Sequence, residues 1–181
     1  IPRTKFWIMK APMSTVYEDK FGGDRYQFQV SMFLQRMMSK GVAVEMVIDC
    51  SALDIKAFER DVSSDETSKS KSPNLYASGT SNVPVKYMHN INEWKEWDVD
   101  YVRLAPTALN DDGTDCVPSE DIIREFIRVA SKHWLARPKS YIAIFDCRAG
   151  MGTAAFLAAS YMCSQLRAPV HVAVASIKDT Q

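Results

Sequence analysis

The sequence predicts an α/β fold in which a mostly parallel central sheet is flanked by helices. Short apolar runs rich in β-branched and aromatic residues alternate along the chain with longer segments of helical periodicity. Such alternation is typical of parallel sheets, because consecutive parallel strands need a crossover between them. With 181 residues, of which 46% are hydrophobic, the chain is long enough to form one compact domain, residues 1–181, with a complete core.

The first third of the chain predicts two strands joined by an amphipathic helix. Residues 5–9 have the composition of a strand, and residues 26–40 place apolar side chains at helical spacing. Gly41 favours the end of that helix, since glycine readily takes the left-handed conformation. Residues 42–48 are predicted as a second buried strand and residues 52–60 as a short helix. The predicted apolar positions of the long helix are Phe28, Val30, Met32, Phe33, Leu34, Met37 and Met38.

Residues 61–83 differ from the rest of the chain in composition. They contain seven serines and two threonines and few large apolar side chains. Such a segment cannot bury enough apolar area to order itself, so it is predicted as a flexible insertion in the domain. A plain surface loop and a phosphorylated or partner-binding segment are both compatible with this composition.

Residues 84–104 predict two more strands, at 84–88 and 99–104, with a turn or short helix at 91–97. Trp94 and Trp97 flank two charged residues in that short segment. Indole rings can stack on nucleic-acid bases, but packing of this segment onto the core explains the same pattern and is the preferred interpretation.

A long amphipathic helix is predicted at residues 119–136. Ser119 is a suitable N-cap, and Glu120 and Asp121 in the first turn complement the helix dipole. Pro138 follows the helix and prevents its continuation.

The last part of the chain predicts a buried strand at 140–145 and a nearly all-apolar helix at 153–166. Residues 169–178 fit a helix or a strand, because Val170, Val172 and Val174 alternate.

Gly150 and Gly152 lie between that strand and that helix. Glycines allow successive backbone N–H groups to converge on an anion at a helix N-terminus. An ordinary strand–turn–helix connection would have the same spacing.

The run Asp146-Cys147-Arg148-Ala149-Gly150-Met151-Gly152-Thr153-Ala154 resembles the signature of the cysteine-dependent phosphatases, His-Cys-x-x-Gly-x-x-Arg-[Ser/Thr]. The resemblance makes Cys147 the nucleophile position. It makes a phosphate-binding loop of Arg148, Ala149, Gly150, Met151, Gly152 and Thr153. It also implies an α/β phosphatase fold and favours a helix for residues 169–178.

Three positions depart from the signature. Asp146 stands at the histidine, Thr153 at the arginine, and Ala154 at the hydroxyl residue. A threonine cannot copy the bidentate grip of a guanidinium on phosphate. Losing one such contact typically lowers the rate about 100- to 1000-fold. The carboxylate of Asp146 would also disfavour a thiolate at Cys147.

The order of segments is similar to that of the RNA 5′-triphosphatase domain of the animal-type mRNA capping enzyme. The matching pieces are the opening run 6–14, a helix before a strand that ends in Asp49, the segment 100–104, the helix start at 118–121 and the strand before the loop. This resemblance covers most of the chain outside residues 61–84. It implies an RNA 5′ end or another phosphate ligand, and a protein partner or a fused guanylyltransferase-type domain.

The general acid of such chemistry has only weak candidates. In dual-specificity phosphatases it is an aspartate on the segment that precedes the long helix, here 105–115. Asp111, Asp112 and Asp115 are candidates by position, of which Asp112 is taken as the weak first choice. Asp-Asp-Gly is also a common turn sequence.

Composition limits the other possibilities. Cys50, Cys116, Cys147 and Cys163 form no Cys-x-x-Cys pair, so neither a metal nor a redox motif is indicated, and no cofactor is expected. Cys50 and Cys163 are predicted to be packed thiols. His89, His133 and His171 show no metal-ligand spacing and are assigned structural or surface roles. No apolar stretch approaches the ~18 residues of a membrane span.

The balance of 22 basic and 22 acidic residues argues against a strongly basic RNA-binding surface. Together these observations predict a phosphatase-like domain with impaired catalysis, serving as a binding or scaffolding module in a capping-related protein. A weakly active RNA 5′-triphosphatase or protein phosphatase using Cys147 is the alternative. The chain is expected to be part of a longer protein in a reducing compartment, the nucleus or the cytoplasm.

Overall fold

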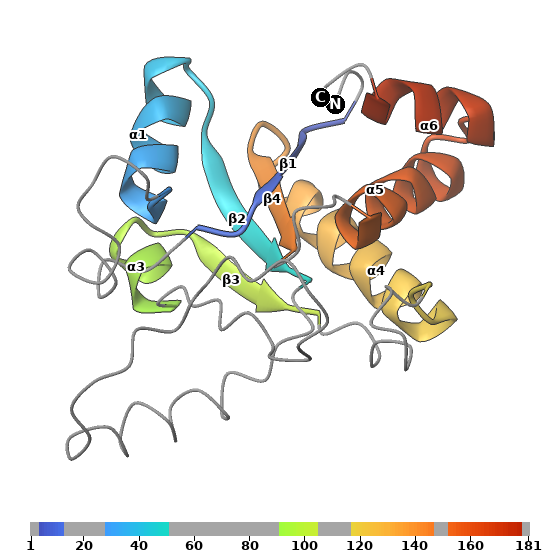
Figure 1. Ribbon diagram of the computed structural model, residues 1–181, viewed down its shortest axis with the longest axis horizontal. Coiled ribbons are helices and arrows are strands. Elements are labelled where there is room, and N and C mark those ends of the chain that lie inside the picture. The colour runs from blue at the N-terminus through green and yellow to red at the C-terminus, as the bar shows by residue number, and fades with distance from the viewer. Residues whose placement is uncertain (1–3, 13–27, 51–90, 105–116, 147–151, 179–181) are drawn as a thin grey trace, which may run out of the picture.

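A computed structural model describes residues 4–12, 28–50, 91–104, 117–146 and 152–178 (Figure 1). The strands in these ranges are β1 (Phe6–Lys10), β2 (Val44–Asp49), β3 (Asp100–Arg103) and β4 (Tyr141–Asp146). The helices are α1 (Val30–Ser39), α3 (Ile91–Glu96), α4 (Glu120–Ala136), α5 (Gly152–Gln165) and α6 (Val170–Lys178). The predicted elements at 52–60 and 84–88 and the insertion at 61–83 lie outside the described residues.

The four described strands form one parallel sheet in the order β1-β4-β2-β3. Ile144 of β4 lies opposite Ile8 of β1 on one side and Ile48 of β2 on the other. The register shifts between Val44 and Met46, where β2 is irregular. Because all four strands run the same way, their carboxyl ends share one edge of the sheet, and the α/β prediction is confirmed.

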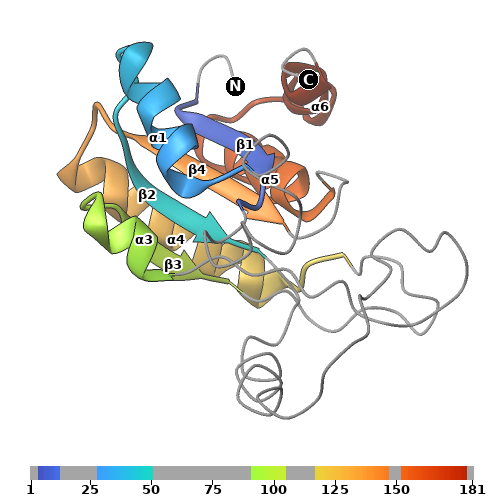
Figure 2. The same ribbon diagram turned by 60° about the vertical axis from the view of Figure 1, so that its left-hand side comes forward.

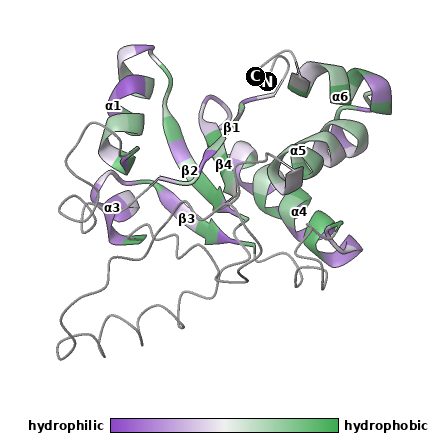
Figure 3. Ribbon diagram, in the orientation of Figure 1, coloured by the Kyte–Doolittle hydropathy of each residue, from purple (hydrophilic) through white to green (hydrophobic). Residues whose placement is uncertain are grey.

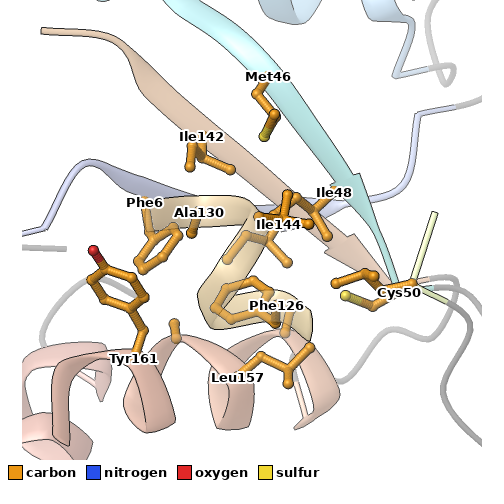
Figure 4. Close-up of a cluster of buried hydrophobic side chains, with 14 of the residues drawn as sticks. Phe6, Met46, Ile48, Cys50, Phe126, Ala130, Ile142, Ile144, Leu157 and Tyr161 are labelled. Carbon is orange, nitrogen blue, oxygen red and sulfur yellow. The ribbon is translucent and has the colours of Figure 1, made fainter. Parts of the chain in front are cut away.

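Helices cover both faces of the sheet (Figures 1 and 2). Alternate residues of β4 supply the two cores. Ile142 and Ile144 pack with residues of α4, α5 and α6, whereas Ala143 and Phe145 pack with residues of α1 and α3. Figure 4 shows the first of these cores, in which Phe6 of β1 lies near Phe126 of α4. Their ring centroids are 5.4 Å apart.

Local sequence signals set several helix ends. The Ser119 hydroxyl accepts a hydrogen bond from the Ile122 backbone N–H at 3.4 Å and so caps α4, as predicted. Gly41 follows α1 with a φ of +69°, the left-handed conformation expected after a helix. Residues 170–178 are helical, and the buried pair Ala173 and Ile177 has the four-residue spacing of a helix face rather than the alternation of a strand.

The predicted start of the first helix and part of its apolar face are wrong. The helix begins at Val30 rather than at residue 26, and Phe28 precedes it. Met32 and Met38 are 50% and 65% exposed. The buried stripe needs only positions i, i+3, i+4 and i+7, and these are occupied by Val30, Phe33, Leu34 and Met37.

Hydropathy differs between the three helices α4, α5 and α6, which cover the same face of the sheet (Figure 3). Hydrophobic residues dominate α5 and α6, whereas α4 alternates hydrophobic and hydrophilic positions. Within the described ranges, no helix combines the length and the apolar composition that crossing a membrane requires.

Candidate functional site

The predicted strand and helix lie on either side of the candidate loop. β4 ends at Asp146 at the carboxyl edge of the sheet, and α5 begins at Gly152. This edge is where open parallel sheets place their ligand sites. The loop residues between these elements, and the candidate acids, lie outside the described residues; they are Cys147, Arg148, Ala149, Gly150, Met151, Asp111, Asp112 and Asp115.

Two of the predicted phosphate-binding residues are described, and they form the first turn of α5. Gly152 is exposed, whereas Thr153 is buried with a relative exposure of 4%. Ala154 and Leu157 behind it belong to the core against α4. A threonine held in this way offers one hydroxyl close to its own backbone, while an arginine from the same position could extend over a bound anion.

Asp49 is a buried carboxylate at the same edge. It is the last residue of β2, and the Tyr101 hydroxyl of β3 donates a hydrogen bond of 2.5 Å to its Oδ2. Desolvation by burial, followed by the charge of Asp49, raises the pKa of Tyr101 well above its usual value. Tyr101 therefore stays a neutral donor to the carboxylate.

Strand register places acidic residues at the ends of the two central strands and basic residues at the ends of the two outer ones. Lys10 of β1 is opposite Asp146 of β4, and Asp49 of β2 is opposite both Phe145 and Arg103. Asp49 therefore lies on the strand beside β4, opposite Phe145, and Phe145 precedes Cys147 by two positions in the sequence. A buried carboxylate at that place opposes the binding of an anion nearby.

Sequence reasoning treated Asp49 only as the end of a strand and did not assign it to the site. The contact with Tyr101 depends on the alignment of two strands far apart in the sequence. The available signal was the position of an acidic residue directly after a buried apolar run, which in a parallel sheet means the carboxyl edge.

Cys50 is confirmed as a packed thiol. It is fully buried directly after Asp49, and its backbone N–H donates to the Phe145 carbonyl at 2.9 Å. Cys163 in α5 is only half-buried. The prediction of a packed thiol therefore holds fully for Cys50 and in part for Cys163.

The remaining predicted residues are structural where they are described. Trp94 is fully buried and stacks on Phe145 with ring centroids 6.1 Å apart, which confirms the packing interpretation. His133 is buried in α4 and His171 is exposed on α6, while His89 is outside the described residues. Among the described residues, no group of three His, Cys, Asp or Glu side chains has a geometry that could hold a metal ion.

Comparison with known proteins finds similar folds among solved structures. No family model matches the chain, and no curated protein matches it significantly. A solved structure described as a protein tyrosine phosphatase from Leishmania major is similar over 97% of this chain and 77% of its own, with a TM-score of 0.54 and 13% identity. PTPMT1 in complex with PI(5)P is similar over 83% of this chain and 72% of its own, with a TM-score of 0.49 and 14% identity.

The first of these likenesses establishes the fold. The parallel sheet with helices on both faces is the fold that this chain shares with the structure from Leishmania major. At 13% identity the likeness concerns the fold alone.

Proposed function

We propose that this chain is a phosphatase-fold domain with impaired catalysis that acts as a binding or scaffolding module. The observation that carries this proposal is Thr153. It occupies the signature position of the phosphate-binding arginine, and its side chain is buried in the first turn of α5.

The chemical argument rests on what a phosphoryl transfer site needs. The arginine of the signature binds two phosphate oxygens and stabilises the charge that develops in the transition state. Thr153 provides no positive charge, and the buried carboxylate of Asp49 lies at the end of β2, the strand beside β4. Both features weaken the attraction of this edge for phosphate.

The proposed biological setting follows from the resemblance to capping-type RNA triphosphatases. A domain that keeps the order of those segments but lacks the arginine would bind an RNA 5′ end or another phosphate group weakly. It would work beside a protein partner or a guanylyltransferase-type domain, in the nucleus or the cytoplasm.

The alternative function is a weakly active RNA 5′-triphosphatase or protein phosphatase. Cys147 and Gly150 favour it, because they have the spacing of the cysteine and the glycine in the phosphatase signature. Backbone N–H groups of the loop would then supply all the stabilisation of the transferred group.

A turnover assay distinguishes the two functions. The purified domain should release no phosphate above background from an aryl phosphate or from RNA carrying a 5′-triphosphate. Cys147→Ser is the diagnostic variant and Cys163→Ser the matched control. Turnover that Cys147→Ser abolishes and Cys163→Ser leaves unchanged would establish the weak phosphatase instead.

A titration tests the remaining binding. Inorganic phosphate should shift the backbone amide signals of Gly152 and Thr153 with a dissociation constant in the millimolar range, about −4 kcal/mol. An absence of shifts at tens of millimolar phosphate would remove the phosphate-binding part of the proposal.

A further inference from the structure

A basic surface lies at the edge of the sheet where the strands begin, here called the amino edge, opposite the candidate loop. The end of α1, the start of β1 and the turn before β4 meet at this edge (Figure 1). Lys40 and Lys139 are exposed, and Lys5 is half-buried. The Lys5 ammonium donates to the Pro138 carbonyl, in the turn that also carries Lys139. The three lysines therefore come from three segments that are far apart in the sequence.

Two half-buried aromatic side chains lie beside these lysines. Trp7 of β1 and Tyr141 of β4 pack from the same side of the sheet against the core below α1. The Lys40 ammonium lies over the Trp7 ring, 5.6 Å from its centroid, which is a cation–π contact. The Tyr141 backbone N–H donates to the Ala43 carbonyl at 2.8 Å and so holds the start of β4 beside the segment that follows α1. Cationic and aromatic groups thus share one surface.

Two carboxylates of the amino edge face an arginine rather than these lysines. The Arg137 guanidinium lies 3.0 Å from an Asp100 carboxylate oxygen and 3.6 Å from a Glu45 carboxylate oxygen. Within the described ranges, none of the three lysines forms an ion pair with a carboxylate. The chain is neutral as a whole, but the three charges at this surface favour the approach of an anion.

We infer that this amino-edge surface, formed by Lys5, Trp7, Lys40, Lys139 and Tyr141, binds single-stranded nucleic acid. Proteins bind single strands with cations that follow the phosphates and with aromatic rings on which the bases stack. A phosphate bound by Lys40 would bring its base next to the Trp7 indole. An acidic peptide carries no bases and would make no use of the aromatic side chains. The inference does not depend on the proposed function, because the candidate loop lies at the opposite edge of the sheet.

A purely structural role for the lysines makes a different prediction. Basic residues that follow a helix complement the negative end of its dipole. Lys40 follows α1, and the turn with Lys139 follows α4. If this were their whole role, the surface would have no affinity for nucleic acid. The affinity for an oligonucleotide therefore separates the two roles.

The test measures binding of a fluorescein-labelled oligouridine of about ten nucleotides with a 5′-hydroxyl end. This probe offers no terminal phosphate to the candidate loop, so the result does not depend on whether that loop binds phosphate. Lys40→Glu and Lys139→Glu should each weaken binding by about 3- to 10-fold at about 50 mM salt. Lys95→Glu, on exposed α3 beside β3, carries the same charge change and should alter the affinity by less than about twofold.

The salt dependence provides a second readout. Three phosphate contacts on a single strand predict that the wild-type affinity falls by about 20-fold between about 50 and 200 mM salt. Loss of one contact in Lys40→Glu should reduce this fall to about 7-fold. An affinity of the wild type that does not change with salt would overturn the inference.

Three further outcomes would also overturn it. The first is no binding by the wild type at about 1 mM oligonucleotide, and the second is equal affinity of Lys40→Glu, Lys139→Glu and the wild type. The third is polyglutamate of equal charge binding as tightly as the oligonucleotide, which would assign the surface to an acidic protein partner instead.

Backbone amide shifts of the wild type cover the case in which a variant does not fold. The oligonucleotide should shift the signals of Trp7, Lys40 and Tyr141 and leave those of Gly152 and Thr153 in place. Shifts confined to Gly152 and Thr153 would place the nucleic acid at the candidate loop and would refute the amino-edge surface.

Discussion

The two edges of the sheet handle charge in opposite ways. At the amino edge, Arg137 meets Glu45 and Asp100 with all three side chains roughly half exposed. At the carboxyl edge, the Asp49 carboxylate is fully buried and held by Tyr101. Exposed ion pairs contribute little because water screens them, whereas a buried charge depends on every partner that it has. The change in the free energy of unfolding when each charge is removed should therefore show whether that charge stabilises the fold or is retained for a functional site.

The largest effect is expected from Asp49→Ala. It leaves the partly buried Tyr101 hydroxyl without its charged acceptor and should lower the free energy of unfolding by about 2–3 kcal/mol in urea denaturation. Asp100→Ala, the matched carboxylate of the amino edge, should cost no more than about 1 kcal/mol. An increase in stability for Asp49→Ala would instead mark Asp49 as a charge retained for function at the expense of stability.

Thr153→Arg combined with Asp146→His should have a smaller effect on stability and should make it depend on anions. Placing a long charged side chain at a buried position should cost about 1–3 kcal/mol without a ligand. Sulfate should then stabilise the double variant more than the wild type, by about 2.7 kcal/mol at a hundred times its dissociation constant. Thermal unfolding in sodium sulfate, with sodium chloride at equal ionic strength as control, measures the difference. If sulfate stabilises the two proteins equally, the side chain at position 153 does not reach an anion site.

Tyr101→Phe should have the smallest effect at neutral pH, about 1 kcal/mol for the lost hydrogen bond. Because the folded pKa of Tyr101 is raised, its contribution is complete below an unfolded pKa of about 10 and is lost as the pH rises above that value. Absorbance titration of the folded protein near pH 10 should give the same tyrosinate signal for wild type and Tyr101→Phe. A smaller signal in the variant would mean that Tyr101 ionises freely and that the contact with Asp49 is weak.

Local chemistry explains which parts of the fold were predictable. The cap at Ser119 and the glycine at 41 act within one turn of the chain, so their sequence signals are complete. Met32 and Met38 were wrongly predicted to lie on the buried face of the helix, because burial depends on which face of α1 meets the sheet. The alternating valines of α6 were ambiguous for the same reason, since only packing against α5 decides which residues are buried.

The strand and the helix that flank the candidate loop were predictable, but the side-chain contacts around the sheet edges were not. Thr153 follows directly from comparison with the signature, and β4 and α5 lie where the strand–loop–helix pattern predicts them. The contact between Asp49 and Tyr101 requires the register of β2 with β3. The contact between the His133 ring and the Ser140 hydroxyl likewise requires the turn that follows α4, and no residue pattern specifies either pairing.

The pairing of β1 with β4 also constrains how the chain folds during its synthesis. Within the described sheet β1 has β4 as its only neighbour, and Phe6 lies opposite Ile142. Since β1 leaves the ribosome long before β4, it must wait until β4 has been made before it can join the sheet. Closing so long a loop is entropically costly and slow. Until then the apolar side of β1 has no partner in this sheet, so this segment is open to non-native contacts while the rest of the chain is made.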